Sequence, residues 1–302
     1  MRVIFMGTPD FSVLPLRRIA ERHEVVLVVS QPDKPKGRGY KLLPTPVKAC
    51  AEELGIEVYQ PEKLNDESVV EYLRGFNADI IVVAAYGKKL PVPILEMPKY
   101  KCINIHASLL PKYRGAAPIN RAIMNGDKTG GVTIMYMAEG MDTGDMVLQR
   151  SFDISSMTAG EYHDKLSEIG SDAVLEAMEL IESGNAHPIK QNDEEATHAA
   201  KITKEECFVP FDTDATAAYN KIRGLSPSPC AYIDFCGKRI KIVECELSTD
   251  TGDIGKVLST DKNGIKIAFL GGSIIMKRIR PEGSGEMTGW AYVLGHESEF
   301  KQ

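Results

Sequence analysis

The stretch IIVVAA at residues 80–85 decides the fold class, because it is a continuous apolar run bordered by polar segments. A short apolar run without alternation is typical of a strand that is buried on both faces, as in a parallel sheet. Similar runs lie before and after it, at Val3–Met6, Val25–Val29 and Cys102–Ile105. Helix-like segments separate the runs, for example 47–54 and 67–76. This alternation predicts an α/β fold with a doubly wound, mostly parallel, Rossmann-like sheet.

The second half of the chain changes character twice. Apolar residues recur every three or four positions from Tyr162 to Leu180, which predicts one long amphipathic helix. The sequence then turns polar, and after about residue 206 it holds several short strand-like runs separated by turn signals, a pattern typical of a small β-barrel. We therefore predict an α/β domain over 1–185, a linker over 186–205 and a second, smaller barrel domain over 206–302.

The composition is that of an ordinary globular protein, since 43% of the 302 residues are hydrophobic and 26% are charged. The net charge of −6 argues against a protein that binds nucleic acid over its whole surface, although a local basic patch is compatible with it. The apolar runs are too short to span a membrane, and the first residues enter a strand-like run without a signal segment. We therefore expect a cytoplasmic protein that does not bind membranes.

Two cofactor sites that the sequence suggests at first sight fail on inspection. The turn GTPDF at residues 7–11 lies where dinucleotide-binding proteins carry G-x-G-x-x-G, but Pro9 replaces the second glycine. The second strand-like run also lacks an acidic residue at its end that would hold a ribose, so we expect no NAD site. The six cysteines form no C-x-x-C pair, and we expect reduced thiols and no metal.

The residues that can carry chemistry lie in CINIHASLLPKYRG, at 102–115. Asn104 and His106 are two apart in a strand, so their side chains point to one face. At the carboxyl end of a parallel strand they can serve a pocket, as an amide donor and a group that titrates near neutral pH. A lone histidine is more often a satisfied core residue. The Gly- and Asp-rich loop at 137–145 can bring Asp142 to the same pocket, although by itself it is also compatible with an ordinary turn.

Four motifs, in order and spacing, resemble the signature of the formyltransferases that use 10-formyltetrahydrofolate. They are Asn104-x-His106, Ser108-Leu109-Leu110-Pro111, Arg114-Gly115-x-x-Pro118 and Met141-Asp142-Thr143-Gly144. The resemblance covers nearly the whole chain and implies that 10-formyltetrahydrofolate is the co-substrate and that the barrel is OB-like. It also implies individual roles: Asn104, His106 and Asp142 are catalytic, Ser108, Leu109, Leu110 and Pro111 line the folate site, and Leu90 meets the pterin through its backbone.

The chemistry of formyl transfer is consistent with the three polar residues. When an amine attacks the formyl carbon, negative charge develops on the carbonyl oxygen, and Asn104 with a protonated His106 can stabilise it. Asp142 would favour the imidazolium and relay the proton of the amine through water. This route requires neither a covalent intermediate nor a metal.

A basic segment at residues 34–48 indicates the acceptor, because it holds five basic residues and no acid. By charge alone, it is also compatible with a solvated surface loop. It resembles the insertion with which methionyl-tRNA formyltransferases hold the acceptor arm. That resemblance implies that Arg38 enters the acceptor stem and that Lys36 and Lys41 contact phosphates. The implied partner is methionyl initiator tRNA, bound by a monomer.

Other functions stay open on the sequence. A sugar-nucleotide amine is the main alternative acceptor, because enzymes that act on it can carry a similar barrel. Hydrolysis of formyl-folate would use the same three polar residues, and only the basic segment and the barrel argue against it. The presence of Asn104, His106 and Asp142 argues against a catalytically inactive RNA-binding relative.

Overall fold

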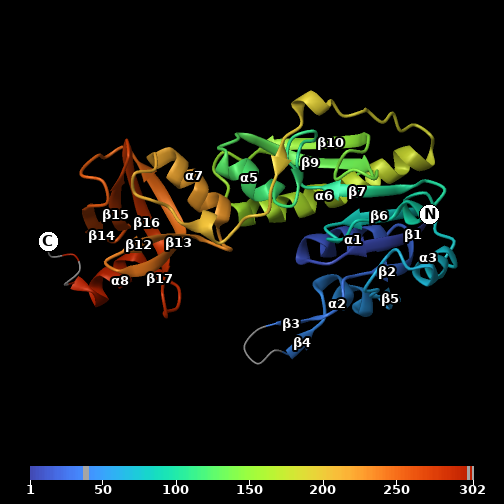
Figure 1. Ribbon diagram of the computed structural model, residues 1–302, viewed down its shortest axis with the longest axis horizontal. Coiled ribbons are helices and arrows are strands. Elements are labelled where there is room, and N and C mark those ends of the chain that lie inside the picture. Colours follow the sequence, from blue (N-terminus) through green and yellow to red (C-terminus); the bar gives the residue numbers. More distant parts are fainter. Residues whose placement is uncertain (37–40, 298–299, 301–302) are drawn as a thin grey trace. The chain divides into compact units, whose positions relative to one another are not determined.

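The structure of the protein is a computed structural model that describes residues 1–36, 41–297 and 300. It contains two compact units (Figure 1). The first comprises Met1–Gly115, Gly130–Phe152 and His163–His198, and the second comprises Ala116–Thr129, Asp153–Tyr162 and the chain from Ala199 onward. Within the described ranges, none of the helices has the length and apolar character that crossing a membrane requires.

A seven-stranded sheet forms the centre of the first unit, in the order β10-β9-β7-β6-β1-β2-β5 (Figure 1). Its strands are β1 (Arg2–Gly7), β2 (Glu24–Val29), β5 (Val58–Tyr59), β6 (Ile80–Ala84), β7 (Cys102–His106), β9 (Thr129–Tyr136) and β10 (Met146–Asp153). The pairs β1–β2, β1–β6, β2–β5 and β6–β7 are parallel, whereas β7 and β9 are antiparallel. The predicted mostly parallel, Rossmann-like sheet is therefore confirmed.

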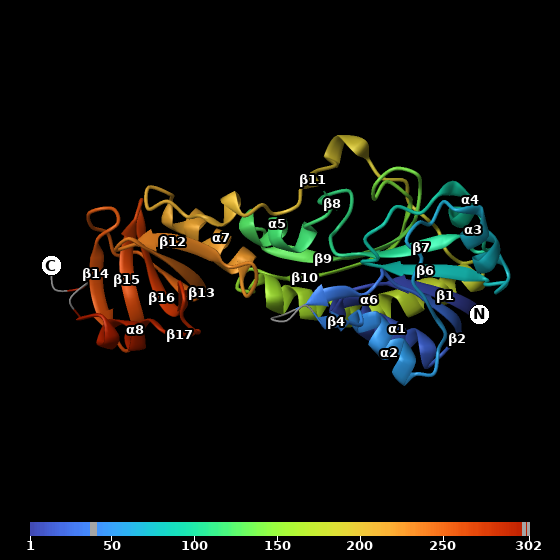
Figure 2. The ribbon, with the colours of Figure 1, turned by 60° about the horizontal axis from the view of Figure 1, so that its bottom comes forward.

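Helices cover both faces of this sheet, which explains why β6 is buried along its whole length. They are α1 (Val13–Ala20), α2 (Pro46–Glu53), α3 (Glu67–Arg74), α4 (Val92–Leu95) and α6 (Ala159–Glu182), with a 3-10 turn at Asp10–Ser12. Val69 of α3 and Ile94 of α4 share an apolar cluster with Ile81 of β6. The helix α6 lies on the opposite face (Figure 2). There Gly170 lies so close to Ile105 that a Cβ on the glycine would be 3.0 Å from Cγ2 of the isoleucine. Glycine thus permits the close approach of α6 to β7.

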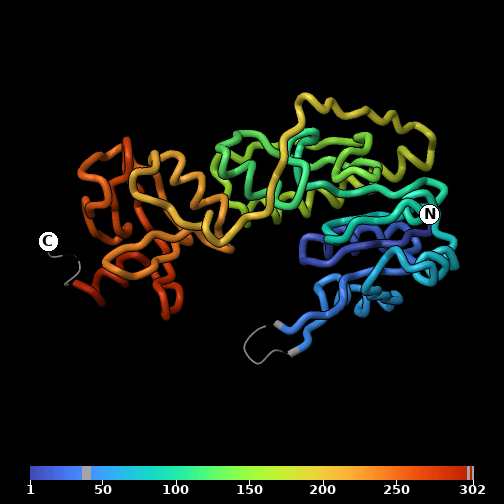
Figure 3. Tube along the Cα trace, viewed as in Figure 1, coloured from blue at the N-terminus to red at the C-terminus, as the bar shows by residue number. Residues whose placement is uncertain are grey.

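Two short strand pairs lie outside the main sheet. The hairpin of β3 (Lys34–Lys36) and β4 (Lys41–Leu43) follows β2, and β8 (Arg114–Gly115) pairs with β11 (His198–Ala199). The chain between α6 and β11, which contains a 3-10 turn at Asp193–Glu195, runs back past β10 (Figure 3). There the Met146 amide donates to the Ile189 oxygen at 2.8 Å. Much of the segment predicted as a linker is therefore packed in the first unit.

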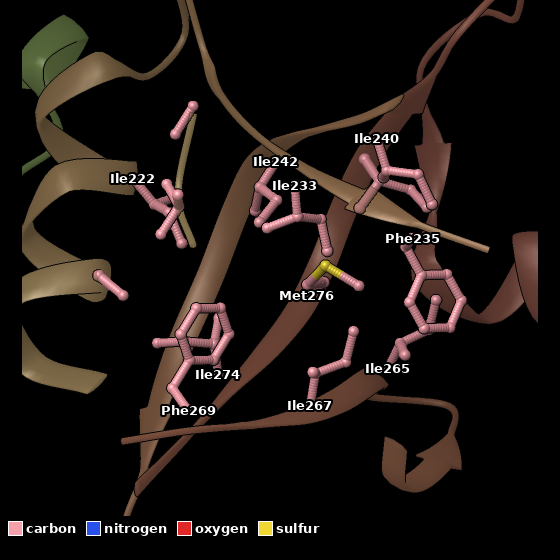
Figure 4. Close-up of a cluster of buried hydrophobic side chains, with 14 of the residues drawn as sticks. Ile222, Ile233, Phe235, Ile240, Ile242, Ile265, Ile267, Phe269, Ile274 and Met276 are labelled. Carbon is pink, nitrogen blue, oxygen red and sulfur yellow. The ribbon is translucent and has the colours of Figure 1, made fainter. Parts of the chain in front are cut away.

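The second unit is built on an antiparallel sheet in the order β12-β13-β16-β15-β14, with β17 paired to β16. Its strands are β12 (Ala231–Phe235), β13 (Lys238–Ser248), β14 (Val257–Asp261), β15 (Gly264–Phe269), β16 (Gly272–Pro281) and β17 (Met287–Thr288). Isoleucines from several strands, including Ile240 and Ile274, fill its core against Ile222 of α7 (Figure 4). A separate antiparallel β unit agrees with the predicted fold class.

Three helices and a 3-10 turn at Glu205–Cys207 complete the second unit: α5 (Pro118–Met124), α7 (Ala215–Leu225) and α8 (Gly289–Gly295). The helix α5 packs on α7, where Nδ2 of the Asn120 side chain donates to the backbone oxygen of Gly224 at 2.7 Å. A helix from the middle of the chain therefore shares a unit with the C-terminal strands. The division at 1–185, 186–205 and 206–302 stays a prediction.

Candidate active site

The end of β7 carries the two polar residues that the sequence places on one face. His106 is 5% exposed, and Asn104 is half-buried. The strand lies between parallel β6 and antiparallel β9, where the direction of the sheet changes. Among the described residues, no group hydrogen-bonds to the side chain of Asn104. A half-buried amide without a partner is available to a ligand.

Two oxygen atoms face the imidazole of His106. Its Nε2 lies 3.1 Å from the backbone oxygen of Tyr113, and its Nδ1 lies 3.6 Å from Oδ1 of Asp142. Since a carbonyl oxygen can only accept, we infer that Nε2 carries a hydrogen and donates it to Tyr113. The distance from Nδ1 to Asp142 is too long for a hydrogen bond, so these groups are neighbours that do not share a proton directly.

Burial decides the charge of this imidazole. Desolvation lowers the pKa of His106, and the opposing effects of Asp142 and of the Tyr113 carbonyl do not outweigh it. His106 is therefore neutral near pH 7 in the substrate-free protein, with Nδ1 unprotonated. The imidazolium expected from the sequence during the reaction stays a prediction, since burial favours the neutral form only before the substrates bind.

Asp142 comes from the loop between β9 and β10 and is held by the backbone. Its Oδ2 accepts a hydrogen bond from the Gly115 amide at 2.8 Å, and its side chain is 18% exposed. A Cβ at Gly144 would lie 1.8 Å from the Tyr136 oxygen, so the close approach of this loop to β9 requires glycine there. The structure thus brings Asp142 beside His106, while their catalytic roles stay predictions.

The turn after β7 holds the four residues predicted to line a folate site. Thr133 of β9 organises the turn: its Oγ1 donates to the Ser108 oxygen at 2.7 Å and accepts from the Leu110 amide at 3.0 Å. Leu109 and Pro111 are half-buried in the same turn. The role of Thr133 was not predicted, although a hydroxyl inside an apolar strand was a signal for it.

Leu90 is buried in the turn that follows β6, close after Gly87 with its φ of 81°. It lines a cavity of about 440 Å³. The other residues of the lining are Glu62, Lys63, Leu64, Asn65, Lys88, Lys89 and Pro91. As far as the described residues go, none of the three predicted catalytic residues lines this cavity. The contact of Leu90 with a pterin stays a prediction.

The basic segment contains β3, β4 and the first residues of α2, and Lys36 and Lys41 are partners across the two strands of the β3–β4 hairpin. Arg38 lies outside the described residues. Leu42, which follows on β4, is 68% exposed. The hairpin therefore places the backbones of Lys36 and Lys41 opposite each other and exposes the side chain of Leu42. The contacts of Lys36, Arg38 and Lys41 with tRNA stay predictions.

The base of the hairpin is a hydrogen-bonded group of polar side chains. Lys48 Nζ pairs with Asp33 at 2.6 Å and donates to Gln60 at 3.0 Å. Gln60 also donates to Asp33, and its hydrogen bond is the main reason that the pKa of this carboxyl is lowered. The charge of Lys48 is therefore compensated within the protein.

Metal-ligating side chains do not gather in the part of the chain that the structure describes, where no three His, Cys, Asp or Glu residues are placed to share an ion. The groups predicted to serve an organic co-substrate are the amide of Asn104, the 108–111 turn and Leu90, and these roles stay predictions.

Comparison with known proteins covers both units. The family model described as formyl transferase matches residues 1–178, and that of the formyl transferase C-terminal domain matches residues 201–297. A methionyl-tRNA formyltransferase from Macrococcus caseolyticus is 46% identical over 301 residues, which are 99% of this chain and 97% of the relative. Another, from Agathobacter rectalis, is 47% identical over 98% of this chain and 96% of its own length.

Solved structures share the fold at lower identity. A methionyl-tRNA formyltransferase from Clostridium thermocellum has a TM-score of 0.58 and 21% identity, over 82% of this chain and 93% of that one. The sugar 3N-formyl transferase WlaRD has a TM-score of 0.69 and 18% identity, over 94% and 99%. The predicted family and the predicted enzyme class, a formyl-group transferase, are confirmed. The chain belongs to the formyl transferase family, and relatives that match it over nearly its whole length are methionyl-tRNA formyltransferases.

Proposed function

We propose that this enzyme transfers a formyl group from 10-formyltetrahydrofolate to the α-amine of methionyl initiator tRNA. The similarity to methionyl-tRNA formyltransferases over nearly the whole chain supports the reaction and the acceptor. The observation that carries the chemistry is His106, buried at the end of β7 with Nδ1 3.6 Å from Asp142. A neutral imidazole beside a carboxylate is suited to moving a proton during acyl transfer.

Three side chains divide the work in this proposal. The unpaired amide of Asn104 donates to the formyl oxygen as that oxygen gains negative charge. Nδ1 of neutral His106 takes the proton that the attacking amine must lose, directly or through one water. The imidazolium formed in this way is stabilised by Asp142 and returns the proton to N10 of tetrahydrofolate as the carbon–nitrogen bond breaks. The proton lost by one nitrogen is thus gained by the other.

The two substrates approach this centre from different elements. The 108–111 turn and the backbone of Leu90 hold the folate. The acceptor arm of the tRNA lies along the β3–β4 hairpin, where Lys36 and Lys41 contact phosphates and Arg38 enters the stem. These assignments need no group from a second chain, which is compatible with the predicted monomer. A tRNA acceptor places the reaction in the cytoplasm.

An acceptor assay tests this function. Labelled 10-formyltetrahydrofolate is incubated with methionyl initiator tRNA, an amino-sugar nucleotide, glycinamide ribonucleotide or buffer alone. We expect label on the tRNA only, and far less label in a parallel reaction with His106→Ala. Transfer to the amino-sugar nucleotide instead of the tRNA would replace the proposed acceptor, and release of formate in buffer alone would indicate a hydrolase.

A further inference from the structure

A buried glutamine outside the motifs of the sequence contacts the loop that carries Asp142. Gln191 lies between α6 and β11 and is 5% exposed, whereas its neighbours along the chain are exposed. Its Nε2 donates to the backbone oxygens of Asp142 at 2.9 Å and Gly144 at 2.7 Å. Its Oε1 accepts from Nε of Arg114 at 2.9 Å. Both hydrogens and the oxygen of this amide are therefore used.

Arg114 is connected to the same loop through Gln191 and through its neighbour Gly115. It lies in β8 directly before Gly115, whose amide donates to the Asp142 carboxylate. Its guanidinium also pairs at 2.8 Å with Asp193, a carboxylate that is 81% exposed. The loop is thus tied to β8 through the side chain of Asp142 and to Gln191 through its backbone.

The conformation of this loop requires external support. Asp142 adopts a left-handed backbone with φ of 55°, which costs about 1–3 kcal/mol in a residue other than glycine. The preceding Met141 is 67% exposed, so it contributes little packing. Since Asp142 lies only 3.6 Å from His106, a small movement of the loop would substantially change the attraction between the carboxylate and the imidazolium that forms when His106 takes a proton.

We propose that Gln191 is a positioning residue, which fixes the backbone at Asp142 so that the carboxylate stays beside Nδ1 of His106. The role rests on the proposed function, because it serves the proton transfer assigned to His106. A glutamate at this position would turn a carboxylate oxygen towards two carbonyl oxygens, and a methionine would leave both carbonyls without a donor. The segment predicted as a linker thereby contributes to the active site.

Kinetics of four variants test the proposal: Q191M, D142N, the double variant Q191M/D142N, and D193N as a control that removes only the exposed partner of Arg114. We expect Q191M to lower kcat by about 10- to 100-fold with an almost unchanged KM for the folate. D193N should behave as the wild type. In the D142N background, Q191M should have little further effect, because the carboxylate that Gln191 positions is already absent.

An NMR titration of the His106 imidazole in the substrate-free protein gives a readout that does not depend on the acceptor. Q191M should lower the pKa of His106, in the same direction as D142N, and D193N should leave it unchanged. An equal kcat loss for Q191M in both backgrounds, or an unchanged His106 pKa, would overturn the proposal. If Q191M does not fold, Q191N serves with the same expectations, because its shorter amide cannot reach both carbonyl oxygens and adds no charge. A wild type that fails to formylate tRNA while the pKa shift persists would contradict the proposed function and leave the positioning role standing.

Discussion

The end of β7 and the β3–β4 hairpin carry the two halves of the proposed reaction, and they are built in opposite ways. At β7, the imidazole of His106 is 5% exposed, and the carboxylate beside it accepts a hydrogen bond from the Gly115 amide. In the hairpin, two three-residue strands pair only with each other, and Leu42 is 68% exposed. A reaction at a single atom requires that the catalytic side chains are fixed in position by several contacts. An exposed basic hairpin is suited to binding a large anionic partner.

This difference determines how each region should respond to substitution. In the buried region, His106 and Asp142 contact each other and the backbone of Tyr113 and Gly115 respectively, so the loss of one side chain leaves the other misplaced or unpaired. Charges on the hairpin act over longer distances and nearly independently, so the loss of one lysine removes only its own share of the attraction.

The largest effect is expected in the buried region. Asn104→Ala and His106→Ala should each lower kcat by about 10²–10³, because each removes a group that acts on the transition state. Asp142→Asn should also lower kcat strongly while preserving the fold. Steady-state kinetics with saturating methionyl-tRNA and thermal unfolding give the two measurements. Near-normal turnover in all three variants would contradict the catalytic roles of these residues, and the two regions would then respond alike to substitution.

The next effect concerns the hairpin. Arg38→Ala should lower kcat/KM for methionyl-tRNA about tenfold or more and leave folate affinity unchanged. Arg38→Lys should restore little, because a planar guanidinium can stack on a base and bind phosphate in a bidentate manner. The experiment compares kcat/KM with folate affinity from titration. If Arg38→Lys were as efficient as the wild type, the hairpin would act through charge alone.

The dependence of stability on pH compares a titrating group of the buried region, His106, with one at the base of the hairpin, Asp33. The fold lowers the pKa of His106 below its unfolded value of about 6.5. Above about pH 6.5 the imidazole is neutral in both the folded and the unfolded chain, and the folded protein has its full stability. As the pH falls towards the folded pKa, the unfolded chain binds the proton more readily, so this stability is lost. Between pH 6.5 and 5.5, the wild type should lose at most about 1.4 kcal/mol more stability than His106→Gln.

Asp33 provides the control for that experiment. The pKa of its carboxyl is also lowered by the fold, but from an unfolded value of about 3.9, so its contribution is lost only at more acidic pH. Asp33→Asn should therefore follow the wild type over this interval in urea unfolding. A profile of His106→Gln that is parallel to the wild type would contradict the neutral, buried imidazole.

The smallest effect is expected for the lysines of the hairpin. Lys36→Ala and Lys41→Ala should each weaken tRNA binding mildly and reduce the slope of log affinity against log salt by about 1, as the loss of one phosphate contact does. Filter binding at several salt concentrations gives the slope. An unchanged slope in both variants would remove these lysines from the tRNA interface.

Local patterns of the sequence determined the fold class and the placement of Asn104 and His106 on one face of a strand. The continuous apolar run at 80–85 predicts a strand covered on both faces, and β6 is buried throughout. The two-residue spacing of Asn104 and His106 places both on one face, because alternation along a strand follows from backbone geometry alone. The motifs around them determined the family, which the comparisons confirm.

Only the tertiary structure decided how these parts meet. The 3.6 Å distance between His106 and Asp142 and the neutral state of the imidazole depend on how the chain packs around the end of β7. Gln191 lies in a stretch whose polar composition predicts a linker, yet its side chain is buried against the Asp142 loop. The physical reason is that strand alternation is set by covalent geometry, whereas burial and hydrogen bonds between distant residues exist only once the chain has assembled.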